Sequence, residues 1–216
     1  MKDLGDLHYC LGIAFWREAG KTLITQSKYV RKILNRFQMS ECKTVSTPLD
    51  QNMKLYSNDG YKEAYGTLYR QLVGSLNYLT TTRPDISYSV SILSKFLAKP
   101  CETHWKVAKQ VLRYLKGTIN FGLLYTDASD VQLAGYSDFD WAGNPDDKKS
   151  TFGYAFHIGS GVMSWSTKKQ PTVSLSSTKV EYKALTNATC EAIWLRRILE
   201  DVGTKQEQAT RIQCDN

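Results

Sequence analysis

The sequence predicts an α+β protein, and three observations support this fold class. Aromatic and β-branched residues flank a turn near the start of the chain, a pattern typical of a β-hairpin. Three amphipathic helical patterns follow between residues 65 and 116. Beyond residue 120 the pattern changes to short strands and a single long helical stretch over residues 177–201. Strands and helices are therefore grouped along the chain, as in α+β proteins.

The first 60 residues are expected to form a hairpin, a helix and a loop. Residues 8–16 and 22–26 predict the two strands of the hairpin. Ser27 is expected to be the N-cap of a helix that ends near Phe37. Residues 40–60 contain Pro48, Gly60 and several Ser, Thr and Asn residues, which predicts a loop or linker.

Three amphipathic helices should follow this linker. They are expected over residues 65–80, from Pro84 to about Leu97, and over residues 103–116. Arg83-Pro84 separates the first two, because a residue before proline avoids helical angles and proline can itself begin a helix. Gly117 is a natural C-cap for the third.

The last third of the chain predicts a sheet and a long helix. Strands are expected over residues 121–125, 131–137, 152–158, 162–167 and 210–214. Within the helix over residues 177–201, the apolar side is expected to include Tyr182, Leu185 and Leu195. A strand reached through a crossover helix should pair in parallel with the first strand of the sheet.

The positive charge is concentrated in the first half of the chain. Residues 1–126 contain 18 Lys and Arg against 9 Asp and Glu, whereas residues 127–216 contain 10 against 12. One stripe of the third helix presents four of these cations: Lys106, Lys109, Arg113 and Lys116. The stripe is either a surface that binds nucleic-acid phosphates or an ordinary solvated face.

Cysteine usage and hydropathy indicate the compartment. The five cysteines are scattered and form no Cys-x-x-Cys pair, which favours free thiols in a reducing compartment. No stretch reaches the length of a membrane span, and the start of the chain has no signal-peptide pattern. We therefore expect a cytoplasmic protein, with a virus-like particle or the nucleus as the alternative places, and no membrane partner.

Three acidic residues indicate the chemistry. Asp138 follows an apolar strand, Glu181 lies on the long helix, and Asp215 follows the last strand. Parallel neighbouring strands and a helix packed over them would bring these carboxylates together, where two Mg²⁺ or Mn²⁺ ions could bind. Taken singly, each acid has a plainer explanation: a strand-end turn, a helix N-terminus or a polar chain end.

The chain resembles the C-terminal part of the Pol polyprotein of copia-type LTR retrotransposons over essentially its full length. The segments that support this resemblance are DLGDLHYCLGI (3–13), QSKYVRKILNRFQMSECKTVSTP (26–48), YRQLVGSLNYLTTTRPDISYSVSILSKF (69–96), HWKVAKQVLRYLKGT (104–118), YSDFDWAGNPDDKKST (136–151), SSTKVEYKAL (176–185) and EAIWLRRIL (191–199).

The resemblance implies a domain organisation and an activity. Residues 1–50 would be the end of a reverse transcriptase, with its primer-grip hairpin and the start of its thumb, and residues 51–120 the helical thumb and connection. Residues 121–216 would be a C-terminally truncated RNase H domain, an endonuclease for the RNA strand of RNA–DNA hybrids. Asp138, Glu181 and Asp215 match its first three catalytic, metal-binding acids.

Departures from the family pattern keep the activity of this chain open. Lys179 stands where the family commonly has Glu, which adds a cation near the expected site. The resemblance places the polymerase acids before Met1 and the last RNase H acid after Asn216. We therefore expect little hybrid cleavage by the chain alone and recovery when the downstream family segment is restored. The alternative function is a non-catalytic nucleic-acid-binding or non-functional transposon remnant.

Overall fold

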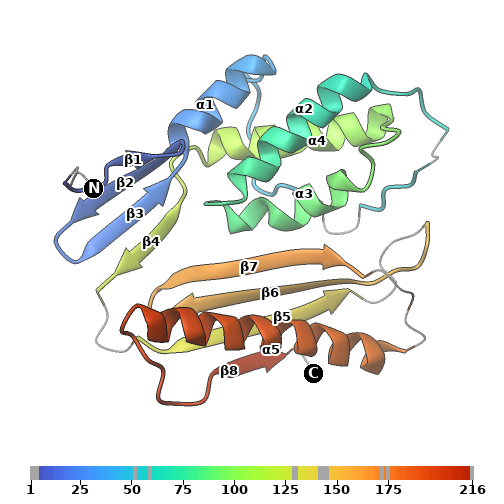
Figure 1. Cartoon of the computed structure of the whole chain (residues 1–216). Helices are drawn as coiled ribbons and strands as arrows, with labels where there is room; N and C mark the ends of the chain where they lie inside the picture. Colours follow the sequence, from blue (N-terminus) through green and yellow to red (C-terminus); the bar gives the residue numbers. More distant parts are fainter. Residues whose placement is uncertain are drawn as a thin grey trace. The chain divides into compact units, whose positions relative to one another are not determined.

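The computed structural model describes residues 5–50, 53–57, 60–127, 131–140, 146–170, 173 and 176–214. The chain divides into two compact units, residues 1–124 and 125–216. Within the described ranges there are two four-stranded sheets, five α-helices and one 3-10 helix (Figure 1). The predicted α+β class is confirmed.

The first sheet contains the N-terminal hairpin and one later strand. Its order is β1 (Tyr9–Cys10), β2 (Ile13–Glu18), β3 (Lys21–Thr25) and β4 (Leu123–Thr126). The single strand expected over residues 8–16 is wrong, because Leu11 and Gly12 have φ values of 48° and 80° and divide it. A Cβ on Gly12 would lie 2.6 Å from the Tyr78 hydroxyl oxygen, so glycine is required there.

The helices of the first unit surround one apolar core. They are α1 (Ser27–Arg36), α2 (Gly66–Leu79), η1 (Pro84–Ile86), α3 (Ser87–Ser94) and α4 (Glu102–Gly117). The expected N-cap at Ser27 is wrong by one residue. Gln26 occupies the cap position, and its buried side chain accepts a hydrogen bond from Thr82 at 2.8 Å instead of capping the helix. Gly117 is the last residue of α4, and Thr118 follows as the cap.

A buried arginine links η1 to the end of α4. The Arg83 side chain is 2% exposed and pairs with Asp85 at 2.7 Å. The same guanidinium donates to the carbonyl and hydroxyl oxygens of Thr118 at 2.9 and 2.7 Å. The Tyr114 hydroxyl donates to Asp85 at 2.8 Å, and Arg83 lies over the Tyr114 and Phe121 rings. These contacts satisfy a charge that would otherwise be costly to bury.

Buried Tyr69 predicts a loss of stability at alkaline pH. Burial raises the pKa of this phenol well above its ordinary value of 10, and its hydroxyl donates to the Leu93 carbonyl at 2.8 Å. The stabilising contribution is therefore complete below pH 10 and is lost as the pH rises toward the folded-state pKa. Above about pH 10 the free energy of unfolding should fall by about 1.4 kcal/mol per pH unit for this group.

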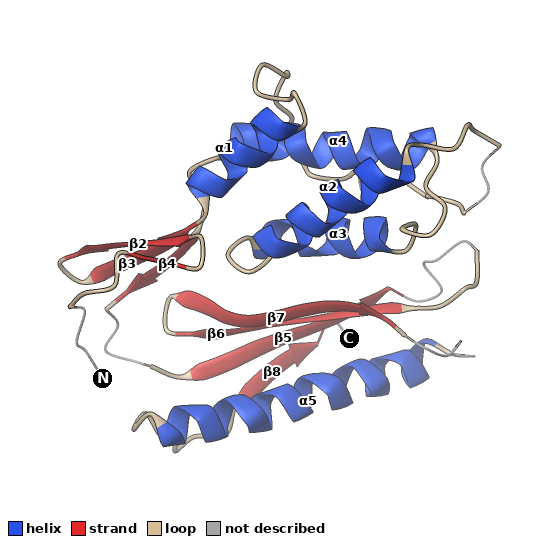
Figure 2. Ribbon diagram, turned by 45° about the horizontal axis from the view of Figure 1, so that its top comes forward, coloured by secondary structure: helices blue, strands red, loops and turns tan. Residues whose placement is uncertain are grey.

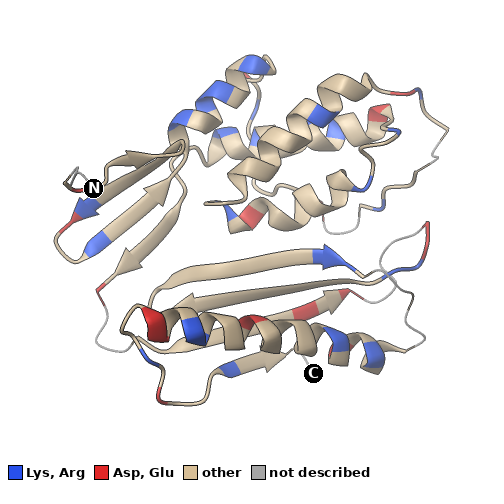
Figure 3. Ribbon diagram, in the orientation of Figure 1, with Lys and Arg blue, Asp and Glu red and all other residues tan. Residues whose placement is uncertain are grey.

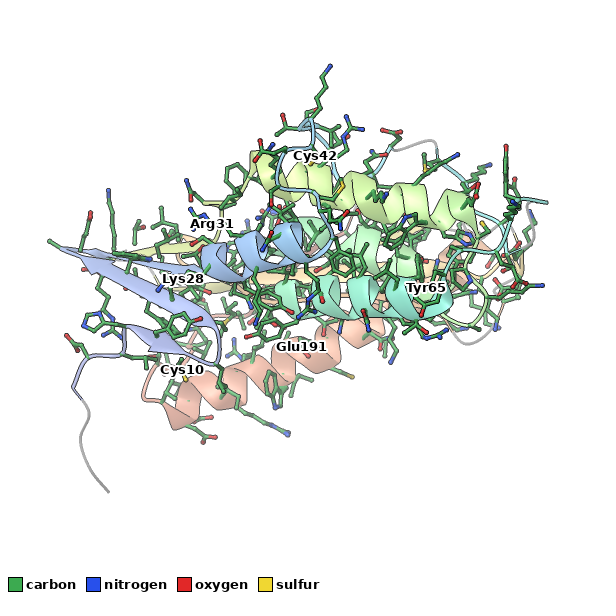
Figure 4. All side chains as sticks on the ribbon, turned by 90° about the horizontal axis from the view of Figure 1, so that it is seen from above. Cys10, Lys28, Arg31, Cys42, Tyr65 and Glu191 are labelled. Carbon is green, nitrogen blue, oxygen red and sulfur yellow. The ribbon has the colours of Figure 1, made fainter. Side chains whose placement is uncertain are left out.

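Chemical denaturation between about pH 9 and 11 tests this expectation. Tyr69→Phe should unfold more easily at neutral pH, because it lacks the hydrogen bond, but with a shallower alkaline dependence. The exposed Tyr65, labelled at the start of α2 in Figure 4, provides a matched Tyr65→Phe control. An unchanged alkaline dependence in Tyr69→Phe would show that other groups control this transition.

The second unit is a mixed sheet with one helix on it. Its strands are β5 (Leu133–Asp140), β6 (Thr151–Ile158), β7 (Gly161–Lys169) and β8 (Arg211–Cys214), in the order β7-β6-β5-β8. Helix α5 (Ser177–Asp201) crosses one face of this sheet between β7 and β8 in the chain (Figure 2). β8 pairs in parallel with β5, as the crossover predicts.

The core of this unit lies between α5 and the sheet. The buried members are Leu133, Phe156, Ala188, Ala192, Leu195 and Leu199. A Cβ on Gly135 would lie 2.3 Å from a Phe156 ring atom, so glycine on β5 lets this ring pack. The expected burial of Tyr182 and Leu185 is wrong: they are 69% and 37% exposed, because small alanines face the sheet instead.

Two further expectations concern thiols and membranes. All five cysteines lie in the described ranges, and none of them forms a disulfide bond, as expected. Among the helices in the described ranges, none combines the length and the apolar character needed to cross a membrane.

Candidate functional site

Asp138 lies near the end of β5, on the exposed side of the sheet. Its neighbours Ser137 and Phe139 line a cavity under α5, and side chains alternate along a strand, so Asp138 points to the opposite face. One carboxylate oxygen, Oδ1, accepts a hydrogen bond from the backbone N–H of Phe139 at 2.7 Å. The side chain is exposed and accessible to a ligand.

Glu181 lies in the second turn of α5 and is half-buried. It lines the cavity of about 170 Å³ that Ser137, Phe139 and Cys214 close from the sheet. Ser137 and Cys214 are register partners on the parallel strands β5 and β8. Glu181 is therefore placed over the last residues of β5, among which Asp138 lies, and over the end of β8, which Asp215 follows in the sequence.

The structure brings these segments together without showing a complete metal site. Asp215 lies outside the described residues, so its position is not established. Among the residues that are described, no group of three or more Asp, Glu, His or Cys side chains is arranged to hold a metal ion. Asp138 and Glu181 approach the strand ends from opposite faces of the sheet, and a shared ion would have to lie at its edge.

Lys179 lies two residues before Glu181 on α5, so the two side chains extend from different sides of the helix. The residue is exposed, and its backbone N–H donates to the Ser176 side chain at 3.3 Å, which caps α5. Its ammonium group therefore extends from the first turn of the helix that positions Glu181.

The basic stripe on α4 is partly engaged within the protein. Lys106 lies over the Tyr61 ring and Lys109 over the Trp105 ring, at 6.0 and 5.4 Å from the ring centres. The Arg113 guanidinium donates to the Lys43 carbonyl at 2.7 Å. Lys109, Arg113 and Lys116 are half-buried, whereas Lys106 is exposed. These contacts hold the cations close to the protein surface.

A second basic face, on α1, is more accessible. Four exposed cations share one side of the helix at three- and four-residue spacing: Lys28, Arg31, Lys32 and Arg36. The helix contains no Asp or Glu, and its opposite side is buried. Figure 3 shows the basic positions along α1, and Figure 4 labels two of them. The amphipathic pattern predicted the helix, but sequence reasoning did not select this face.

Comparison with known proteins relates the chain to retrotransposon polyproteins. The chain is 42% identical over 216 residues to the retrovirus-related Pol polyprotein from transposon RE1 of Arabidopsis thaliana, covering 100% of this chain and 15% of that polyprotein. It is 40% identical over 225 residues to the corresponding polyprotein from transposon TNT 1-94 of Nicotiana tabacum, covering 100% and 17%. The chain is therefore similar over its whole length to part of retrotransposon Pol polyproteins, and it spans about 15% of the length of the curated polyproteins it matches.

Shorter proteins are also similar. An uncharacterized mitochondrial protein of Arabidopsis thaliana is 43% identical over 195 residues, which are 90% of this chain and 80% of that protein. The secreted RxLR effector protein 161 of Plasmopara viticola is 51% identical over 128 residues, covering 59% of this chain and 90% of that protein. No protein-family model and no solved structure gives a significant match.

Proposed function

We propose that the chain is the reverse transcriptase–RNase H part of a copia-type Pol polyprotein. In this proposal the second unit hydrolyses the RNA strand of RNA–DNA hybrids, and the first unit holds the hybrid as the end of the polymerase. The observation that supports it best is the arrangement of β5, β8 and α5. The strand that contains Asp138, β5, and the helix that contains Glu181, α5, line one cavity together with the end of β8.

The donor chemistry fits divalent cations. Asp138, Glu181 and Asp215 would hold two Mg²⁺ or Mn²⁺ ions, since carboxylate oxygens are the ligands that these ions prefer. Bound ions would stabilise the negative charge on the attacking and leaving oxygens of the phosphodiester. The Phe139 N–H restrains one Asp138 oxygen, and α5 fixes the backbone of Glu181. The fold therefore orients the Asp138 side chain before a ligand binds, and it fixes the position from which the Glu181 side chain extends.

Hybrid cleavage tests the proposal. The substrate is an RNA–DNA hybrid labelled on its RNA strand, and a DNA duplex of the same sequence is the control. We expect weak cleavage by the 216-residue chain. Joining it to the downstream segment of a related Pol polyprotein should give stronger, Mg²⁺-dependent cleavage of the hybrid alone. An extended protein that folds and binds the hybrid but leaves the RNA intact would rule out the catalytic role.

The similarity to short proteins favours a second candidate function. The related mitochondrial and effector proteins are mostly covered by this chain, so chains of this kind also exist outside long polyproteins. In this alternative the chain binds nucleic acid through its basic first unit and catalyses nothing. Hybrid binding without cleavage in the extended protein would support it.

The two basic faces should contribute unequally to hybrid binding. Replacing Lys28, Arg31, Lys32 and Arg36 of α1 with Ala should weaken binding more than the same change at Lys106, Lys109, Arg113 and Lys116 of α4. The reason is that contacts within the protein already engage three of the α4 cations, against Lys28 on α1, whose ammonium lies 5.3 Å from the centre of the Tyr9 ring. Each lost phosphate contact should flatten the salt dependence of log K by about 0.9.

Fluorescence anisotropy at several salt concentrations would measure both effects. A larger loss for the α4 variant would show that its cations turn toward the ligand when the hybrid binds. If both variants bind the hybrid with the affinity of the natural chain, both faces are ordinary solvated surfaces.

A further inference from the structure

The face of the second sheet opposite α5 contains a preformed cavity of about 560 Å³. It is lined from β5 by Ala134 and Tyr136, from β6 by His157, and from β8 by Arg211 and Gln213. The register explains this grouping, since Ala134 is the partner of both His157 and Arg211, and Tyr136 is the partner of Gln213. Paired residues project to the same side of a sheet.

An aromatic pair forms one wall of this cavity. The Tyr136 ring stacks on the His157 ring with 5.7 Å between centres and 27° between planes. Tyr136 is nevertheless 51% exposed, so much of its surface is available to a ligand. Single exposed aromatic residues are common, but here the ring is held by a stacked neighbour above the small side chain of Ala134.

The segment that borders the cavity is fixed by hydrogen bonds. The Arg196 guanidinium donates to the Gln208 carbonyl at 2.7 Å and to the Thr210 hydroxyl at 3.0 Å. Gln206 joins the same segment to the start of the sheet, since its side chain accepts from the Leu133 N–H at 2.8 Å and donates to the Val131 carbonyl at 3.0 Å. The cavity therefore exists before any ligand binds.

The polar groups of the cavity define the ligand chemistry. Arg211 is exposed and supplies a cation, and the side-chain amides of Gln208 and Gln213 supply donors and acceptors. None of the described residues that line the cavity is acidic. An exposed aromatic ring, a planar guanidinium and neutral amides suit a flat, polar, anionic ligand. The volume lies within the range of about 300–1,000 Å³ that is typical of small-molecule sites.

We propose that this cavity binds an unpaired nucleotide of a single-stranded nucleic acid. The base stacks on Tyr136, the amides of Gln208 and Gln213 bond its edge, and Arg211 pairs with a flanking phosphate. Asp138 lies two residues beyond Tyr136 on the same face of β5, about 7 Å along the strand. The bound strand would therefore pass close to the candidate catalytic acid. The inference deepens the proposed function by naming a form of nucleic acid that the second unit holds.

Anisotropy with a labelled oligouridine of about eight nucleotides, in EDTA, tests the site without hydrolysis. Tyr136→Ala should weaken binding at least about fivefold, because a stacked base contributes about that much or more. Tyr136→Phe should bind within about twofold of the natural chain, since the ring remains. Arg211→Gln should lower the salt slope by about 0.7, the value for one phosphate on a single strand. Tyr182→Ala, at an exposed position on α5 outside this cavity, is the control and should have no effect.

Photo-crosslinking of an iodouridine oligonucleotide locates the contact directly. We expect crosslinked peptides from residues 131–140 and 151–158. Crosslinks to residues 27–36 alone, or natural affinity in both Tyr136→Ala and Arg211→Gln, would overturn the proposal. If Tyr136→Ala fails to fold, Arg211→Gln and the crosslinked peptides decide. Loss of hybrid cleavage with retained oligouridine binding would reject only the catalytic proposal.

Discussion

Replacing Asp138 with Asn is expected to lower hybrid cleavage by the extended protein at least about a hundredfold. Asn keeps the size of the side chain and can still accept the Phe139 N–H hydrogen bond that Asp138 accepts at 2.7 Å. It removes the negative charge that would hold the cations. The loss should therefore appear in the cleavage rate and the Mg²⁺ dependence, with little change in the melting temperature.

Asp140 offers a matched control for this substitution. It lies two residues farther along β5, is also exposed, and shares the face of Asp138 through strand alternation. Asp140→Asn should retain most of the cleavage. Equal losses in both variants would indicate a general effect of negative charge at this strand end, and a loss in Asp140→Asn alone would move the catalytic assignment by two residues.

Arg83→Ala is expected to cause the largest loss of stability, about 3 kcal/mol or more in the free energy of unfolding. The substitution removes the pairing with Asp85 and both hydrogen bonds to Thr118, and it leaves a cavity between η1 and the end of α4. Asp85 is 31% exposed and keeps the Tyr114 hydrogen bond, so water can compensate part of the loss.

Urea denaturation measures this effect. Arg83→Lys should fall between the natural chain and Arg83→Ala, because an ammonium keeps the charge but cannot reach both Asp85 and Thr118 in the planar geometry of a guanidinium. Arg31→Ala, at an exposed position on α1, should change stability by no more than about 0.5 kcal/mol. A loss below about 1 kcal/mol for Arg83→Ala would show that the buried ion pair contributes little net stability.

The elements that periodicity specifies were predictable from the sequence. α2, α4 and α5 agree with their predicted bounds within about two residues, because each buries a regular apolar stripe. The parallel pairing of β8 with β5 follows from the crossover helix between them. These features depend on local patterns and on general rules of connection, which a single sequence contains.

Features that depend on distant partners were not predictable. β4 pairs in the first sheet although it directly precedes the strands of the second, since a strand of four residues does not specify its neighbour. Around Asp138 the alternation is weak, because the polar Ser137 shares a face with Phe139 and the aromatic Tyr136 shares the face of Asp138, so the pattern alone does not show that Ser137 is buried and Asp138 exposed. The engagement of the α4 cations depends on Tyr61 and Lys43, which lie far from that helix in the sequence.

Titration with Mn²⁺ tests the central claim most directly, namely that Asp138 and Glu181 belong to one metal centre. Paramagnetic resonance of the extended protein should detect bound Mn²⁺ whose affinity falls at least about tenfold in Asp138→Asn and in Glu181→Gln. The double variant should lose less binding free energy for Mn²⁺ than the two single variants lose together, because both residues bind the same ions. Asp140→Asn should bind Mn²⁺ as the natural sequence does. Retained Mn²⁺ binding in both single variants, or strictly additive losses, would contradict the shared site.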